Sequence, residues 1–314
     1  MVAKPFPPRD ARLETYRTGN HIVTFGILVP SGRSTMKLRT LFRLAGCAAL
    51  AVALVAALAA AERTSSNANT AGSIPVIVEL FTSEGCSSCP PADELMTKLV
   101  SLQPVPGVEI IALGEHVDYW DHLGWRDPFS SAAFSARQSE YASRVFHTGN
   151  IYTPQMVVNG HEEFVGSDYG AATAAIARAA RLPGPRVRVT LKITRNLSDS
   201  SARFVTQVDA LAGTTLAGTA DVFLAIAEDG LVTQVRRGEN GGRQLRHSAA
   251  TRFLASVGVV PAGAAPWSAA TTVRLARDWD LSRTRIIAFV QDRSTKQILG
   301  ATSDTLAAAV FLKS

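Results

Sequence analysis

A short apolar run followed by two closely spaced cysteines and two prolines constrains the fold of this chain most. Ile74–Phe81 reads IPVIVELF, and the motif CSSCPP begins shortly after it. A β-branched apolar run of this length is typical of a buried strand. Pro90 and Pro91 suit the first turn of a helix, where amide hydrogens lack partners, and Ala92–Leu102 has helical apolar spacing. The cysteines are therefore predicted at a strand-to-helix junction.

Further strands and helices are predicted as far as Leu182. Val108–Leu113 is a second apolar strand, and a helical pattern follows between residues 130 and 145. Residues 155–165 contain the turn pair Asn-Gly and are predicted to form a hairpin, and an Ala-rich helix ends before Pro-Gly. The order βαβ and then αββα implies a parallel strand pair with a right-handed crossover, as in a thioredoxin-like domain.

The chain changes character after residue 184. Val187–Ile193 alternates strictly between apolar and polar side chains, and one short helix is predicted at Ser248–Val257. Other strand-like runs are Phe204–Val208, Val222–Ile226, Leu231–Val235, Thr272–Leu275 and Ile286–Gln291. Several short strands separated by Gly, Asn and Asp are typical of a β-sandwich. The predicted fold class is an α/β thioredoxin-like domain at 74–184 followed by an all-β sandwich-like domain at 185–314.

Residues 36–61 have the pattern of a secretory signal peptide: a basic start, an apolar stretch and small residues before a polar segment. Residues 1–35 fit neither a leader nor a domain, and we interpret them as a disordered upstream segment with a misassigned start, translation beginning at Met36. Residues 62–73 are a predicted linker. We expect the protein in the periplasm or secreted, with membrane attachment only if Leu44–Ala61 stays as an anchor, since a span needs ~17–25 apolar residues.

The basic balance of the chain belongs to this leader. The whole chain has a net charge of +6, and residues 1–61 account for all of it. The remainder is neutral, which argues against a nucleic-acid partner. An exported protein folds where thiols oxidise readily. Beyond the signal only Cys86 and Cys89 remain, which is too few for a disulfide scaffold.

Cys86 and Cys89 have the spacing of a redox-active dithiol. Exchange requires one sulfur that is exposed and partly thiolate, and a second that resolves the mixed disulfide. A helix N-terminus favours the thiolate, so we expect Cys86 to be the nucleophile and Cys89 the resolving thiol. Ser87 and Ser88 can donate hydrogen bonds to the thiolate and modulate it. The expected partners are protein or small-molecule thiols and disulfides, and no cofactor is expected.

Three acidic residues near Cys86 and Cys89 oppose formation of the thiolate. Glu84, Asp93 and Glu94 disfavour a thiolate, because nearby negative charge raises the pKa of a thiol. The balance of the two effects sets the reduction potential. Oxidant, reductant and isomerase therefore all remain open.

Thr153 and Pro154 directly precede a strand of the predicted hairpin. If their peptide bond is cis, the preceding backbone is free to pair with an extended substrate beside the nucleophilic sulfur. The alternative is an ordinary proline that begins a strand. The cysteine pair upstream favours the first interpretation, so Thr153 and Pro154 are predicted to bind substrate.

His116 and Asp118 follow the second predicted strand, at the sheet edge that also carries Cys86. They are predicted modulators of the cysteines, although such residues more often cap a loop. Two thiolates with His116 would also suit a soft ion such as Cu(I), so a copper-binding metallochaperone is one alternative. A noncatalytic binding module with a locked Cys86–Cys89 disulfide is another. No metal ligand is assigned, since a closed zinc site needs four ligands.

The stretch GENGGRQLRH lies in the second predicted domain. Arg243, Arg246 and His247 within it could contact an anion. Its Gly and Asn content favours a solvated turn between a strand and a helix instead.

Four strings carry a family resemblance: VELFTSEGCSSCPPAD, HVDYWDHLGWRDPFSS, RQSEY and YTPQMVVNG. They resemble an exported bacterial thioredoxin-like family of unknown function, and the resemblance continues into GENGGRQLRH and IIAFVQ. It implies a thiol-disulfide role carried by Cys86 and Cys89 with Pro154. The Trp-Cys-Gly-Pro-Cys of thioredoxin is absent, which leaves redox direction and partner open.

Overall fold

The computed structural model describes residues 13–18, 21–26, 72–182, 187–196, 200–211, 213–308 and 310–312. The chain forms two units, Met1–Ala68 and Asn69–Ser314. In the first unit, β1 (Leu13–Thr18) pairs antiparallel with β2 (His21–Gly26), within the segment that the sequence predicts to be disordered. The predicted signal peptide lies outside the described residues. Among the described helices, none has the length and apolar content needed to span a membrane.

The first half of the second unit has the predicted order of elements. These are β3 (Ile74–Thr82), α2 (Pro90–Leu102), β4 (Val108–His116), α3 (Ala132–Tyr141), β5 (Gln155–Val158), β6 (Glu162–Val165) and α4 (Tyr169–Arg181). β3 pairs parallel with β4 and antiparallel with β5. The β5–β6 turn is made by Asn159 and Gly160, which have φ values of 48° and 68° and so fit the Asn-Gly signal.

The second half consists mostly of strands. These are β7 (Val187–Asn196), β8 (Ser201–Ala210), β9 (Ala220–Glu228), β10 (Leu231–Gln234), β11 (Gln244–His247), β12 (Ala250–Val260), β13 (Trp267–Arg274), β14 (Thr284–Asp292), β15 (Ile298–Thr305) and β16 (Val310–Leu312). A four-stranded sheet has the order β13-β8-β7-β16, and β10 pairs with β11. The predicted strands at 187–193, 204–208, 222–226, 231–235 and 286–291 coincide with β7, β8, β9, β10 and β14.

The predicted fold class is wrong, because one sheet runs through both halves. It has eight strands in the order β15-β14-β9-β12-β4-β3-β5-β6, and the fold is mostly β. The free edge that an isolated α/β domain would have at β4 is occupied by β12, through Ala250 opposite Gly114. A Cβ on Gly114 would lie 3.2 Å from the Ala249 carbonyl oxygen, so glycine permits this approach. The predicted boundary at residue 184 lies outside the described residues.

The helix predicted at Ser248–Val257 is also wrong, since this segment forms β12. The register of β12 against β9 shifts between Thr251 and Phe253 and again between Ser256 and Gly258. Each irregularity breaks the two-residue alternation that identifies a strand in a sequence. The apolar spacing that remains resembles a helical period.

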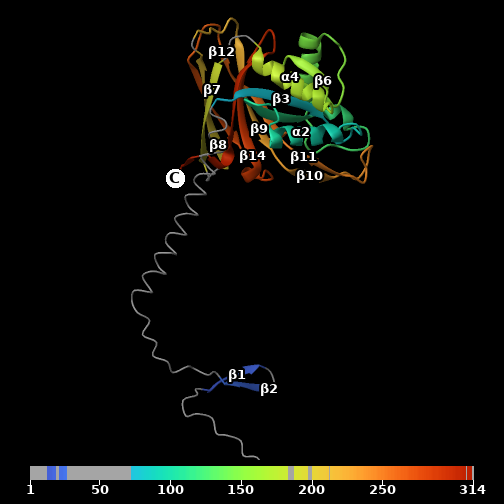
Figure 1. The fold of residues 1–314 in the computed structure, drawn as a ribbon, viewed down its shortest axis with the longest axis vertical. Helices are drawn as coiled ribbons and strands as arrows, with labels where there is room; N and C mark the ends of the chain where they lie inside the picture. The colour runs from blue at the N-terminus through green and yellow to red at the C-terminus, as the bar shows by residue number, and fades with distance from the viewer. Residues whose placement is uncertain are drawn as a thin grey trace, which may run out of the picture. The chain divides into compact units, whose positions relative to one another are not determined.

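The eight-stranded sheet is covered by helices in one part and by the second sheet in another. α2 and α4 lie beside β3, while β7 and β8 lie beside β14 (Figure 1). Buried Val78 and Leu80 of β3 pack in the core that contains the helices. Val189 of β7 packs with Val222 of β9 in a core between the two sheets. The strand-to-helix junction that carries the cysteines is therefore joined to a packed core on both sides, through β3 and α2.

Candidate active site

The two cysteines lie at the start of α2 and are joined to each other. Cys89 is the N-cap residue of the helix, and Pro90 begins it. The Cys86 and Cys89 sulfurs form a disulfide. The N–H of Cys89 donates to the carbonyl of Cys86 at 3.2 Å, and the N–H of Ala92 donates to that of Cys89 at 2.8 Å. The predicted strand-to-helix junction is confirmed.

The structure brings Cys86 against the predicted substrate-binding residues. Its Sγ lies 3.8 Å from the carbonyl oxygen of Thr153 and 3.3 Å from the hydroxyl of Ser88. The Thr153–Pro154 peptide bond is cis, as predicted. The indole N–H of Trp120 donates to the Thr153 hydroxyl at 2.9 Å and holds this backbone in place.

The expected exposure of the nucleophilic sulfur is wrong. Cys86 is 1% exposed and Cys89 is 0% exposed. The loop between β10 and β11 reaches this junction: the Asn240 amide donates to the carbonyls of Glu84 and Cys86, both at 2.9 Å. The carboxylate of Glu239 accepts from the N–H of Ser87 at 2.9 Å. We define Gly238–Gly242 as the covering loop.

Five titratable side chains lie buried behind the motif, and we call them the motif cluster: Glu84, Asp93, His116, Asp127 and His247. His247 Nε2 lies 3.1 Å from Glu84 Oε1, and its Nδ1 lies 3.7 Å from Asp93 Oδ2. His116 Nδ1 lies 2.7 Å from Asp127 Oδ2. The two imidazole rings meet edge to face at 4.7 Å between centroids. The sequence identified His116 as a modulator, and the structure places it in this cluster.

The motif cluster shifts the pKa values of two of its members. Burial favours neutral His247, but the negative charges of Asp93 and Glu84, together with the hydrogen bond to Glu84, act more strongly and raise its pKa to about 10. Burial raises the pKa of Asp127, while His116 and the backbone N–H groups of Glu84 and Phe129 lower it by more, so the net shift is downward. His247 thus carries a buried positive charge close to the disulfide.

Asp118 is placed differently from the prediction. Its carboxylate accepts from the hydroxyl of Ser135 at 2.5 Å, and its own N–H donates to the same hydroxyl at 3.1 Å. These contacts anchor the loop after β4 to α3, as a loop-capping residue does. The exposed Ser87 is bonded through its N–H to Glu239, whereas Ser88 faces the sulfur.

Asn240 and His247 are the principal residues that sequence reasoning missed. The stretch GENGGRQLRH was predicted to be a solvated turn, yet Asn240 is 0% and His247 2% exposed. Arg243 donates to Asn240 Oδ1 at 2.9 Å, and Arg246 is exposed on β11. The inclusion of this stretch in the family resemblance was the one signal that could have found them.

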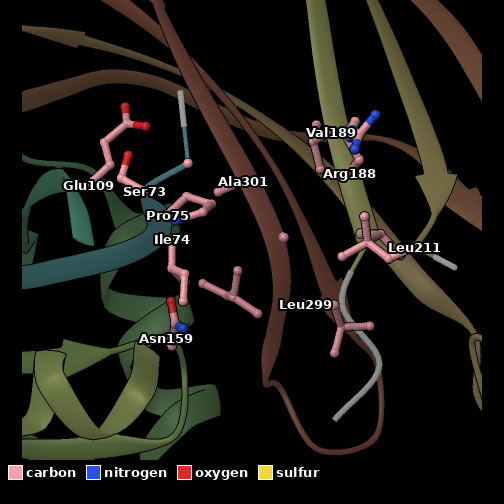
Figure 2. Close-up of a pocket in the computed structure, with 14 residues that line it drawn as sticks. Ser73, Ile74, Pro75, Glu109, Asn159, Arg188, Val189, Leu211, Leu299 and Ala301 are labelled. Atoms are coloured by element: carbon pink, nitrogen blue, oxygen red, sulfur yellow. The ribbon is translucent and has the colours of Figure 1, made fainter. Parts of the chain in front are cut away.

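A cavity lies elsewhere, where β3, β4, β7 and β15 meet (Figure 2). Its volume is about 540 Å³, and its described lining holds neither cysteine nor histidine. Its main polar groups bond within the protein: Glu109 accepts from Ser303 at 2.8 Å, and Asn159 accepts from the N–H of Ile77 at 2.9 Å. The cavity therefore offers no cysteine or histidine for thiol or metal chemistry among its described lining residues.

A metal site is the alternative interpretation of the two cysteines and His116. Within the described part of the chain, no three His, Cys, Asp or Glu side chains are grouped as metal ligands. The copper alternative needs both thiols reduced, whereas here the two sulfurs bond to each other.

A family profile described as "Protein of unknown function (DUF1223)" matches residues 77–291. The chain belongs to the DUF1223 family. The match spans both cysteines, Thr153–Pro154 and the covering loop. The predicted membership of a family of unknown function is confirmed at this level, while no comparison supports the thioredoxin-like part of that prediction. None of the curated proteins matched the chain.

One of the solved structures similar to this DUF1223 chain supports the fold. A crystal structure of a protein from Agrobacterium tumefaciens has a TM-score of 0.54 and 22% identity, covering 77% of this chain and 99% of that one. A domain of the outer membrane lipoprotein Omp28 from Porphyromonas gingivalis has a TM-score of 0.27 and 13% identity, covering 42% of this chain and 94% of that one. The sporulation control protein Spo0M from Bacillus subtilis has a TM-score of 0.28 and 11% identity, covering 42% and 51%. Only the Agrobacterium tumefaciens structure is similar enough to support a conclusion, and that conclusion concerns the fold.

Proposed function

We propose that the protein is an exported thiol-disulfide oxidoreductase that acts through Cys86 and Cys89, in the periplasm or outside the cell. The observation that supports this is the contact between Cys86 Sγ and the carbonyl oxygen of Thr153, at 3.8 Å. A backbone carbonyl beside a disulfide sulfur offers an acceptor for the main chain of a substrate at the point of exchange. Ser88 on the same side is exposed, so the substrate approaches from there.

Exchange begins when a thiolate of the substrate attacks Cys86 Sγ. A bond forms between the substrate sulfur and Cys86, the Cys86–Cys89 bond breaks, and Cys89 leaves with the electron pair. A second substrate thiolate then displaces Cys86, so the substrate is oxidised to a disulfide and the protein is reduced. The reverse sequence oxidises the protein. Because Cys86 is 1% exposed, the groups packed around it must move before the first step.

Burial of the sulfurs favours a second candidate function, a noncatalytic binding module stabilised by a locked disulfide. Structural disulfides are buried and resist reduction, whereas catalytic ones react readily. The two candidates differ in whether the disulfide of the folded protein is reactive. Reduction by dithiothreitol without denaturant separates them, and a disulfide that opens only on unfolding would favour the binding module.

The test of exchange is trapping with Cys89→Ser. This variant keeps Cys86 as nucleophile but cannot resolve a mixed disulfide, so covalent adducts with disulfide-bearing partners, formed as Cys86 attacks the partner disulfide and displaces one of its sulfurs, should accumulate in an extract. The variant with both Cys86→Ser and Cys89→Ser is the matched control and should form none. If Cys89→Ser forms no adducts with proteins of the extract, and also none with a model disulfide, this result would falsify the exchange mechanism.

A further inference from the structure

His247 is buried between two carboxyl groups, and one of its ring nitrogens lacks a partner. Its Nε2 lies 3.1 Å from Glu84 Oε1, but its Nδ1 has no hydrogen-bond partner among the described residues. The nearest carboxyl oxygen to Nδ1, Asp93 Oδ2, is 3.7 Å away, which exceeds a hydrogen bond. Unpartnered buried polar atoms are few in folded proteins, and each requires a reason. Movement of a proton between His247 and Asp93 would supply one.

Asp93 connects His247 to the resolving cysteine. It lies four residues after Cys89, and its N–H donates to the Cys89 carbonyl at 3.2 Å. Helical side chains four residues apart share a face, and each leans toward the helix N-terminus, here toward Cys89. Cys89 is 0% and Asp93 7% exposed, so both face the interior. Thr82 donates to Asp93 Oδ1 at 3.1 Å, while Oδ2 faces His247.

Reduction of the disulfide creates a charge that this interior must neutralise. When Cys89 leaves with the electron pair, it becomes a thiolate that is shielded from water. A buried, unpaired negative charge is unfavourable, so Cys89 needs a proton from a group inside the protein. The motif cluster holds such a proton on His247, which carries its charge through neutral pH.

We propose that Asp93 and His247 form a proton relay for Cys89, an inference that rests on the proposed function. His247 Nδ1 passes its proton to the Asp93 carboxylate, and Asp93 delivers that proton to Cys89 Sγ. The sulfur loses its negative charge as His247 loses its positive charge, so the interior gains no net charge. Oxidation of the dithiol returns the proton along the same route. Asp93 is thus the proton donor, and His247 is a positioning residue that acts through it.

Several groups face His247 and belong to any account of its pH dependence. Glu84 precedes the motif, Asp93 lies on α2, and His116 ends β4, with Asp127 bonded behind it. Glu84 Oε2 also accepts from the Trp125 indole N–H at 2.8 Å, which fixes this carboxyl. Asp93 lacks a comparable bond to its Oδ2 in the described structure, so this oxygen can accept the proton of His247 Nδ1.

The test is the rate at which dithiothreitol reduces the disulfide-bonded protein, divided by the thiolate concentration at each pH. For the wild type this normalised rate should stay constant at neutral pH and fall near pH 10, where His247 loses its proton. Asp93→Asn should lower it on the order of 10²-fold at pH 7, the low end for a positioned proton donor, and should remove the fall near pH 10. His247→Gln should also lower the normalised rate at pH 7, by a smaller factor. Asp304→Asn, at an exposed site on β15 outside the motif cluster, is the matched control and should leave rate and profile unchanged.

Two outcomes overturn the relay. The first is a folded Asp93→Asn protein with the wild-type rate and pH profile. The second, which needs no variant, is an equal normalised rate for the wild type in H₂O and D₂O, because proton delivery in the rate-limiting step should slow the reaction in D₂O. If the wild-type disulfide is not reduced at all without denaturant, the proposed function fails. If it is reduced and the variants behave as wild type, only the relay fails.

Discussion

Two buried clusters of charged side chains join the halves of this molecule, and they differ in what their cation can do. The motif cluster lies behind the cysteines and is centred on His247. The second, which we call the sheet cluster, lies on the eight-stranded sheet and is centred on Arg137: Glu79, Glu115, Arg137, Tyr141 and Gln291. In the motif cluster His247 from the second half meets carboxyl groups from the first, and in the sheet cluster Gln291 from the second half bonds to Arg137 and Tyr141.

The cation of the sheet cluster is fixed on every side. Arg137 donates to Glu79 at 2.5 Å, to the Tyr141 hydroxyl at 2.9 Å and to Gln291 at 3.2 Å. Tyr141, Phe223 and Phe289 place their rings 5.1 to 5.6 Å from its guanidinium carbon. A guanidinium keeps its charge at every physiological pH, whereas an imidazole can release a proton. The sheet cluster is therefore built to stabilise, and the motif cluster has the chemistry to react.

The largest effect that separates the clusters is expected from Arg137→Met. Removal of the cation leaves Glu79 and Glu115 buried without their partner, which typically costs about 3–5 kcal/mol. Denaturant unfolding with the disulfide intact measures this loss. The rate of disulfide reduction in the folded protein should not change, because Arg137 does not belong to the motif cluster.

The control for this loss is Arg144→Met, which removes an exposed pair with Glu140 four residues away. Such pairs contribute about 0.3–0.5 kcal/mol. Equal losses from the two variants would show that the sheet cluster does not stabilise the fold in the way described.

A smaller effect on stability and a larger one on reactivity are expected from Asn240→Ala. The variant leaves the carbonyls of Glu84 and Cys86 without the amide donor, which costs about 1–3 kcal/mol. Since the same bonds hold the covering loop against the backbone of the cysteine motif, their loss should loosen the motif, and reduction by dithiothreitol should accelerate about tenfold or more. Gln244→Ala, on the exposed side of β11, is the matched control. Reduction of Asn240→Ala at the wild-type rate would mean that another element limits access.

The local parts of this structure could be predicted from the sequence, while the long-range parts could not. Cys86 and Cys89 at a strand-to-helix junction follow from propensity and turn chemistry within a few residues. Their closeness to Thr153 follows from a common order of elements. His247 is different, because its partner Glu84 lies 163 residues earlier in the chain. The apolar pattern of either segment carries no information about a contact between residues so far apart in the chain.

The error in fold class has the same origin. Strand alternation predicts that a strand exists, but not which edge it joins, so the pairing of β12 with β4 left no trace in the pattern. The bulges of β12 also hid the strand itself, through the shifts at Thr251 and Ser256. Glu84 and Asp93 were recognised only as charges that oppose a thiolate. Their compensation by buried His247 depends on that unpredicted pairing.

The smallest effect, and the one that tests the sheet cluster by pH, is expected from Glu115→Gln. Burial, and then the charge of Glu79, raise the pKa of Glu115 well above its usual value against the opposing charge of Arg137. A carboxyl whose pKa is raised in the folded state stabilises the fold below its unfolded pKa, and this contribution is lost as pH rises through the folded pKa. Gln has no proton to lose, so the free energy of unfolding of Glu115→Gln should exceed that of the wild type increasingly above about pH 4.5. The difference should grow with pH until the folded-state pKa of Glu115 is passed and should then level off.

Unfolding curves of both proteins between acid and mildly alkaline pH measure this difference directly. His247 titrates in the wild type and in Glu115→Gln alike, so its contribution cancels when the two free energies are subtracted. Glu94→Gln, at an exposed site, should show no such trend with pH. A difference that is constant with pH would mean that Glu115 is ionised in the folded protein, so that the single cation Arg137 faces two carboxylates. The sheet cluster would then hold an excess negative charge and would not stabilise the fold in the way described.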